Sequence, residues 1–124
     1  MPVIGAHVLL YTTEPERLRA LLRDVFGWRN VEDPGSEPGW LIFALPPTEL
    51  GVHPSEGAAN HELSLICDDL QATKADLESK GVEFRGEPAD LGFGIAVTMM
   101  LPGGVEMLLY EPRHESPLDL SRDA

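Results

Sequence analysis

Basic residues are scarce in this sequence of 124 residues, and acidic residues outnumber them. Lys and Arg total 9 against 21 Asp and Glu, so the formal net charge is −12 with neutral His. Nucleic acid and anionic membrane surfaces repel a protein of this charge, so we expect neither as a partner. A cationic ligand, or a neutral ligand held by a local site, is compatible with the charge.

Cysteine and long apolar runs are nearly absent as well. The one cysteine, Cys67, excludes a disulfide within the chain and is typical of a protein in a reducing cytoplasm. No apolar run approaches the roughly 20 residues that cross a bilayer, and the first five residues lack the basic start of an export signal. We therefore expect a cytoplasmic protein. With 43% apolar and 24% charged residues, the composition favours a compact domain over disorder.

What the sequence does contain is an internal repeat. His7 and His61, which each begin an apolar segment, are 54 positions apart, and so are Gly27 and Gly81, which each end a helix-like run. Repeats of this kind determine the whole architecture. The sequence therefore predicts two similar halves, joined by a loop over residues 54–60.

Each half has the signals of a helix between strands. Thr13 and Glu16 have the spacing of a capping box at the start of the first helix, and Asp69 is the expected cap of the second. Gly27 and Gly81 end the two helices. Strand patterns flank the helices at residues 7–11, 29–32, 40–45 and 49–53, and again at 61–67, 82–86, 94–101 and 105–110.

This order predicts an α+β fold with a single domain over residues 1–124. We expect modules at 1–56 and 57–112, and a frayed tail at 113–124 because it has few apolar residues. A half of this size buries little by itself, so the two halves are expected to pair. Their helices would then cover one face of the sheets, and the concave face opposite would form a cavity.

Alternation along the strands selects the residues that line this cavity. If His7 faces the cavity, the same face carries Leu9, Tyr11, His61, Leu63 and Leu65. Glu49 and His53 share one face of their strand, and Glu106, Leu108 and Tyr110 share one face of the last strand. The opposite face of these strands is apolar and is expected to join the core: Leu50, Val52, Val105, Met107 and Leu109.

The cavity face therefore gathers imidazoles and carboxylates. Its candidates are His7, Glu49, His53, His61 and Glu106. These groups suit a divalent metal ion such as Zn²⁺, Ni²⁺, Fe²⁺ or Mn²⁺. Aromatic residues at Trp40 and Phe93 are further candidates for the ligand site, with Phe93 in a glycine-flanked loop at residues 91–94 that could act as a lid.

The sequence resembles the vicinal oxygen chelate superfamily, which includes glyoxalase I, extradiol dioxygenases, fosfomycin-resistance enzymes and bleomycin-resistance proteins. The matching stretches are residues 7–28, 48–54, 61–84 and 101–112, among them Phe26-Gly27-Trp28, Cys67-Asp68-Asp69-Leu70 and Leu101-Pro102-Gly103-Gly104. The resemblance implies two βαβββ modules that form a mixed-sheet cup with helices on its outer face, commonly in a homodimer. Pairing of the modules within one chain or between two swapped chains is open.

The resemblance also implies a metal site. His7 and His61 match the two histidine ligands of the metalloenzymes, and Glu49 matches the first glutamate ligand. The position of the second glutamate is occupied by Leu108, which cannot bind a metal. Glu106 lies on the same face about 7 Å along the strand, and His53 is another replacement.

Two functions follow from these residues. The first, which we predict, is a glyoxalase-like metalloenzyme of lyase, isomerase or dioxygenase type, in which the metal polarises vicinal oxygens of the substrate and Glu49 or Glu106 moves a proton. The second is a metal-free protein of the bleomycin-resistance type that sequesters a small cationic ligand, favoured by the charge and by Leu108. In either case, the small-molecule ligand is expected to contact Trp40, His53, Phe93, Leu108 and Tyr110.

Overall fold

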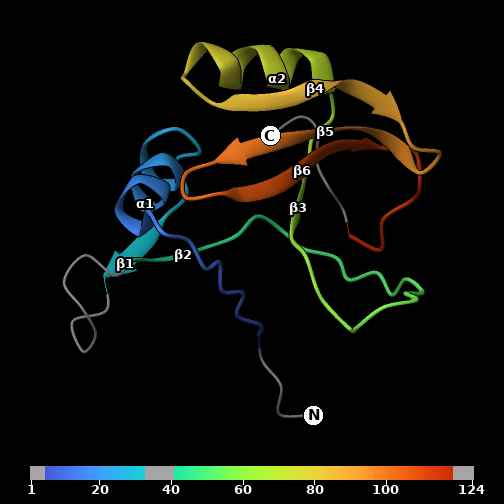
Figure 1. The fold of residues 1–124 in the computed structure, drawn as a ribbon, viewed down its shortest axis with the longest axis horizontal. Coiled ribbons are helices and arrows are strands. Elements are labelled where there is room, and N and C mark those ends of the chain that lie inside the picture. The colour runs from blue at the N-terminus through green and yellow to red at the C-terminus, as the bar shows by residue number, and fades with distance from the viewer. Residues whose placement is uncertain (1–4, 33–40, 119–124) are drawn as a thin grey trace.

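The computed structural model describes residues 5–32 and 41–118 (Figure 1). In chain order the elements are α1 (Pro15–Asp24), β1 (Asn30–Glu32), β2 (Leu41–Phe43), β3 (Ser64–Ile66), α2 (Leu70–Ser79), β4 (Glu83–Asp90), β5 (Gly94–Leu101) and β6 (Val105–Pro112). Strands β1 and β2 form a two-stranded antiparallel sheet, and the other four form a sheet in the order β3-β6-β5-β4. The predicted α+β class is confirmed. Neither helix of the described residues is long and apolar enough to cross a bilayer.

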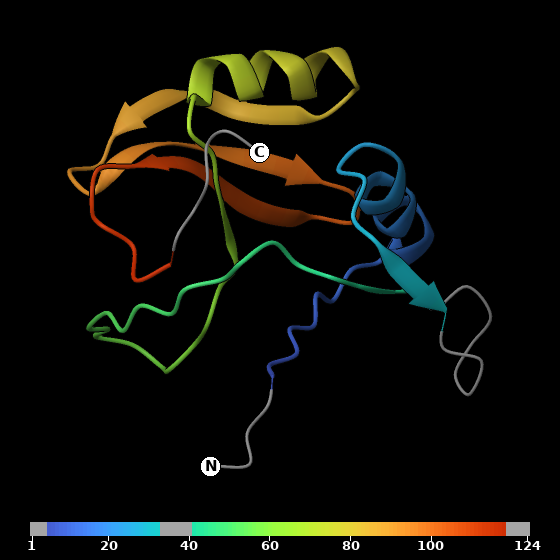
Figure 2. The same cartoon turned by 180° about the vertical axis from the view of Figure 1, so that it is seen from behind.

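The second half of the chain is a complete βαβββ unit. Strand β3 runs parallel to β6, whereas β5 is antiparallel to both β4 and β6. Helix α2 covers one face of this sheet, as Figures 1 and 2 show from opposite sides. The expected strand at residues 94–101 coincides with β5, and the expected strand at 105–110 continues to residue 112 in β6.

Local signals fix both ends of α2. The Asp69 side chain accepts a hydrogen bond from the Ala72 amide at 3.1 Å, so the predicted cap is confirmed. Gly81 has φ +94°, which allows the chain to reverse into β4 after the helix. At the start of the helix, the Leu70 amide donates to Glu111 Oε1 on β6 at 3.0 Å. Because an amide in the first turn has no acceptor within the helix, this bond joins α2 to the sheet.

The start of α1 differs from the prediction, because Glu14 rather than Thr13 precedes the helix and Pro15 lies in its first turn. Proline has no amide hydrogen and its fixed φ suits this position. Thr12 Oγ1 accepts from the Glu14 amide at 3.1 Å and donates to the Pro102 carbonyl at 2.8 Å. The start of α1 is thereby fastened to the turn between β5 and β6.

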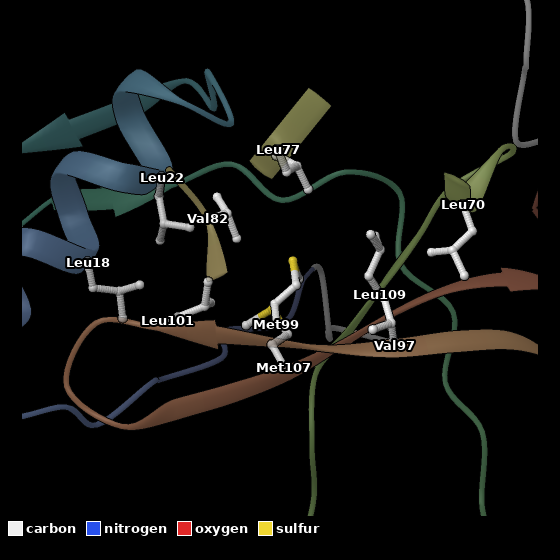
Figure 3. Packing of buried hydrophobic residues seen from close by; sticks show 10 residues of the cluster. All are labelled: Leu18, Leu22, Leu70, Leu77, Val82, Val97, Met99, Leu101, Met107 and Leu109. Atoms are coloured by element: carbon white, nitrogen blue, oxygen red, sulfur yellow. The ribbon is translucent and has the colours of Figure 1, made fainter. Parts of the chain in front are cut away.

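The hydrophobic core lies between the helices and one face of the four-stranded sheet (Figure 3). Its ten buried residues come from α1, α2, β5, β6 and the residue just before β4: Leu18, Leu22, Leu70, Leu77, Val82, Val97, Met99, Leu101, Met107 and Leu109. Met107 and Leu109 are core residues as predicted, and Val105 packs against them. The helices thus lie on the outer face of the sheet.

The first half has fewer strands than expected. Residues 7–11 and 49–53 lie within the described part of the chain and form no strand. The strand expected at 40–45 is shorter than predicted, because β2 covers only Leu41–Phe43. Leu50 and Val52 are 91% and 95% exposed, so their assignment to the core was wrong. A strand is stable only beside a hydrogen-bonded neighbour, and residues 44–63 instead cross the side of the four-stranded sheet opposite α2 (Figures 1 and 2).

Candidate functional site

The face of the four-stranded sheet that points away from the helices carries the residues between the core positions. On β6, Glu106, Leu108 and Tyr110 alternate with the buried Met107 and Leu109, in agreement with the predicted alternation. Residues of β3 and β5 are paired with these three across the sheet. We call this surface the open face, and its residues are Ser64, Ile66, Ala96, Thr98, Met100, Glu106, Leu108 and Tyr110.

Strand β3 has the opposite parity to the prediction. Leu63 and Leu65 pack against the core, so Ser64 and Ile66 take the open face, beside Leu108 and Tyr110. Burying Leu63 and Leu65 is more favourable than burying Ser64 and Ile66 in their place, because one of the second pair is polar. A shift of one residue reverses every side chain of a strand, so the expectation that Leu63 and Leu65 line the cavity was wrong.

A cluster of polar and aromatic side chains lies at the C-terminal end of β6. We call it the Glu49 cluster, and its members are Glu49, Phe93, Tyr110, His114 and Ser116. Glu49 Oε2 accepts a hydrogen bond of 2.6 Å from the Ser116 hydroxyl, and Glu49 Oε1 lies 3.7 Å from His114 Nε2. The Phe93 and Tyr110 rings meet edge to face, with centroids 5.4 Å apart. Three residues predicted for the site, Glu49, Phe93 and Tyr110, thus come together from distant parts of the chain.

Hydrogen bonding selects the tautomer of a neutral His114 ring. His114 Nδ1 lies 2.9 Å from the Glu115 carbonyl, which can only accept, so Nδ1 carries the hydrogen. In the neutral ring, Nε2 is then an acceptor for the Tyr110 hydroxyl, 3.3 Å away. Burial, and secondly the negative charge of Glu49, raise the pKa of Tyr110, so its hydroxyl remains a donor at neutral pH.

The Glu49 carboxylate is the charged group of this cluster. Its side chain is only 16% exposed, and within residues 5–32 and 41–118 its contacts are a hydroxyl and an imidazole rather than a lysine or arginine. Removing a carboxylate from water without a cationic partner is costly. A ligand that brings a positive charge or hydrogen-bond donors would offset that cost, and the neighbouring aromatic rings can contact its apolar part.

The other predicted site residues lie elsewhere. His7, His53 and His61 are exposed, and His53 Nδ1 bonds to the Pro54 carbonyl at 2.8 Å. Glu106 is on the open face but pairs with Arg85 of β4, and Leu108 lies half-buried on that face. Trp40 lies outside the described residues.

The predicted metal ligands, His7, Glu49 and His61, are not assembled by this arrangement. Within residues 5–32 and 41–118, no three His, Cys, Asp or Glu side chains form a group that could hold a metal ion. Glu49 is engaged by Ser116, and both histidines are exposed to solvent. The residues as arranged therefore do not fit the implied ion, and a bound metal stays a prediction.

The sequence analysis missed His114 and Ser116, because the tail was expected to be frayed. Residues 113–118 instead make several contacts, among them a hydrogen bond from the Arg113 amide to the Phe93 carbonyl at 2.8 Å. The signal for His114 was the alternation itself. When the even-numbered face of β6 is continued past the end of the strand, position 114 follows Tyr110 on the same side.

One depression in the described part of the chain lies on the helix side of the sheet and not at this cluster. It has a volume of about 370 Å³, lies beside the start of α2 and is lined by Asp68, Asp69, Leu70, Gln71, Pro88, Ile95 and Glu111. Glu111 is already bound to the Leu70 amide there. We therefore place the candidate site at the Glu49 cluster.

Titration of Tyr110 tests the geometry of the cluster. In a Tyr11→Phe background Tyr110 is the remaining tyrosine, because the chain has two. Glu49→Gln removes a charge that raises the pKa of Tyr110, so tyrosinate absorbance should then rise at lower pH. The stability that neutral Tyr110 contributes is present below its unfolded-state pKa and is lost as the pH rises through its folded-state pKa. Glu56→Gln, an equal charge change in an exposed loop, is the control, and equal shifts in both variants would contradict the contact.

The second half of the chain, a βαβββ sheet with helices covering one face and polar and aromatic side chains on the other, defines an α+β protein built on this unit. The model of the Glyoxalase/Bleomycin resistance protein/Dioxygenase superfamily matches residues 5–113. The chain therefore belongs to this superfamily, as its sequence motifs predicted. No curated protein matches it.

Two solved structures share the fold. One is TnmS3, an antibiotic binding protein from Streptomyces sp. CB03234, with a TM-score of 0.62 and 20% identity over 90% of this chain and 98% of that one. The other is a member of the same superfamily from Sphaerobacter thermophilus DSM 20745, with a TM-score of 0.62 and 18% identity over 90% and 99% of the two chains. At these identities the similarity shows the fold alone.

Proposed function

We propose that this protein binds a small organic cation at the Glu49 cluster without a metal ion. The observation that carries the proposal is the poorly exposed Glu49 carboxylate, whose described partners are a hydroxyl and an imidazole. The imidazole, His114, connects Glu49 to the aromatic pair of Tyr110 and Phe93. A cation is attracted more strongly by a poorly exposed carboxylate than by an exposed one, because water screens the interaction less. The net charge of −12 also raises the rate at which cations arrive.

The fold supports a binding role of this kind. TnmS3, which has a similar fold, is described as an antibiotic binding protein. The first half of the chain also exposes Tyr11, Leu50 and Val52, each by 85% or more. Exposed apolar groups of this size favour the homodimer that the sequence predicted, and both the homodimer and the cytoplasmic location stay predictions.

The glyoxalase-like metalloenzyme is the competing function. It needs His7, Glu49 and His61 around one ion, which would polarise vicinal oxygens of a substrate. In that reaction Glu49 or Glu106 would move the proton. Because Glu106 pairs with Arg85, and because the two histidines are exposed, the geometry favours the binding protein.

Dye binding separates the two functions. We expect rhodamine 6G, an aromatic cation, to bind in the presence of EDTA, and fluorescein, an aromatic anion of similar size, to bind far more weakly. Glu49→Gln should weaken rhodamine binding at least about tenfold, because it removes the charge of a poorly exposed ion pair. Glu56→Gln should leave the affinity within about twofold, since exposed charges contribute little. Fluorescence anisotropy measures all four affinities.

Two results would overturn the proposal. Equal weakening by both glutamate substitutions would mean that overall charge, not the cluster, attracts the dye. Binding that appears only after Zn²⁺ is added, and that is lost in His7→Ala and His61→Ala, would favour the metalloprotein instead.

A further inference from the structure

We propose that residues 113–118 form a strap that closes the Glu49 cluster and must release before a ligand can bind. The inference rests on the proposed function, because the strap competes for the carboxylate to which the ligand would bind. Its central contact is the 2.6 Å hydrogen bond from the Ser116 hydroxyl to Glu49 Oε2. The Ser116 hydroxyl therefore occupies the site on Glu49 at which an N–H or O–H donor of a ligand would bind.

The strap is anchored where it leaves β6. The Arg113 amide donates to the Phe93 carbonyl at 2.8 Å, and the Arg113 guanidinium donates to Asp90 Oδ1 at 2.6 Å. Hydrogen bonds from Arg113 and from the Gly92 amide hold the pKa of Asp90 below its usual range, so this carboxylate stays charged. Asp90 ends β4 and Phe93 lies in the loop that follows it, so the strap starts beside the aromatic pair of the site.

The middle and end of the strap lie on the cluster itself. The His114 and Tyr110 rings have centroids 6.0 Å apart, and His114 Nε2 faces both the Tyr110 hydroxyl and Glu49 Oε1. The Ser116 hydroxyl also accepts a hydrogen bond from the Leu118 amide at 3.1 Å. Because that amide occupies an acceptor site of the oxygen, the hydroxyl hydrogen is directed at Glu49.

Polar contacts rather than buried apolar surface hold the described part of the strap, residues 113–118. Residues 113–118 form no helix or strand, and only Ser116 and Leu118 among them are partly buried. Segments with little buried apolar surface and few backbone hydrogen bonds open locally without unfolding the domain. In Figures 1 and 2 this segment lies on the same side of the sheet as residues 44–63, away from α2. It can therefore move away without disturbing the core.

Ser116→Ala in the full chain tests the strap. Loss of the competing donor should raise the affinity for rhodamine 6G about fivefold, the effect of one typical hydrogen bond. Ser79→Ala is the matched control, because the Ser79 hydroxyl bonds to the Asp76 carbonyl within α2. The dye affinity of this variant should equal that of the original chain.

Trypsin cleavage after Arg113 gives a second measurement. Saturating rhodamine should speed cleavage there in the original chain, and Ser116→Ala should speed it without the dye, since both release the strap. Equal dye affinity in the two serine variants, or dye that protects Arg113 from cleavage, would overturn the strap and leave the proposed function intact. Dye that binds none of the chains would overturn both proposals.

Discussion

Gly103→Ala is expected to lower the free energy of unfolding by about 2–4 kcal/mol, through a left-handed backbone and a steric conflict. Gly103 has φ +78° in the turn between β5 and β6. A Cβ at this position would overlap Thr12 Oγ1 and lie 2.8 Å from the Glu14 amide nitrogen. The threonine can rotate only by giving up its bond to the Pro102 carbonyl. The Glu14 amide cannot move unless α1 moves with it.

Gly104→Ala is the matched control for this prediction. Gly104 lies in the same turn with φ +81°, but a Cβ there would meet nothing within 4 Å. It should cost only the left-handed conformation, about 1–2 kcal/mol. Urea unfolding measures both values. Equal losses would show that the turn does not press against the start of α1.

The difference in unfolding free energy between Gly103→Ala and Gly104→Ala measures how tightly the β5–β6 turn is joined to the start of α1. The Gly103 amide also donates to Glu14 Oε2 at 2.8 Å, and that carboxylate bonds to Arg17 at 2.6 Å. Hydrogen bonds from Arg17 and then from Gly103 lower the pKa of Glu14. The stability that this carboxylate contributes is therefore present above its unfolded-state pKa and is lost as the pH falls through its folded-state pKa.

The sequence predicted the elements whose signals are local. Asp69 and Gly81 bound α2 through a side-chain cap and a left-handed glycine, and both act within a few residues of the helix. The hairpin of β5 and β6 is similarly local, because its strands flank a short turn. The strand expected at residues 49–53 depended instead on a distant partner, and alternation along one segment does not report whether such a partner is present.

The residues of the candidate site were likewise predictable only where a local sequence pattern marked them. Glu49 and Tyr110 were found because they lie on the polar side of an apolar alternation, and Phe93 because glycines flank it. His114 and Ser116 were missed because their order comes from contacts with those three residues and not from burial of apolar surface. The pairing of His7 with His61 came from the internal repeat, which fixes the spacing of the helices but not the path of the first half.

Met99→Ala is expected to destabilise the domain by about 2–5 kcal/mol, the usual cost of removing a large side chain from a packed core. Met99 is fully buried and lies between the sheet and the helices in Figure 3. Its neighbour Met100 is only half-buried and lies on the open face, across from Glu106. Met100→Ala should therefore cost less than about 1.5 kcal/mol.

This pair of methionines tests which face of β5 is the core, and with it the location of the site. If Met99 supports the core and Met100 does not, the packed core lies on the face that α2 covers, and the open face is the side that carries the candidate site. Rhodamine affinity should then be unchanged in Met99→Ala at temperatures where the variant is folded. Equal destabilisation by the two substitutions would mean that Met100 is packed as tightly as Met99, which would contradict the assignment of the core to one face of β5.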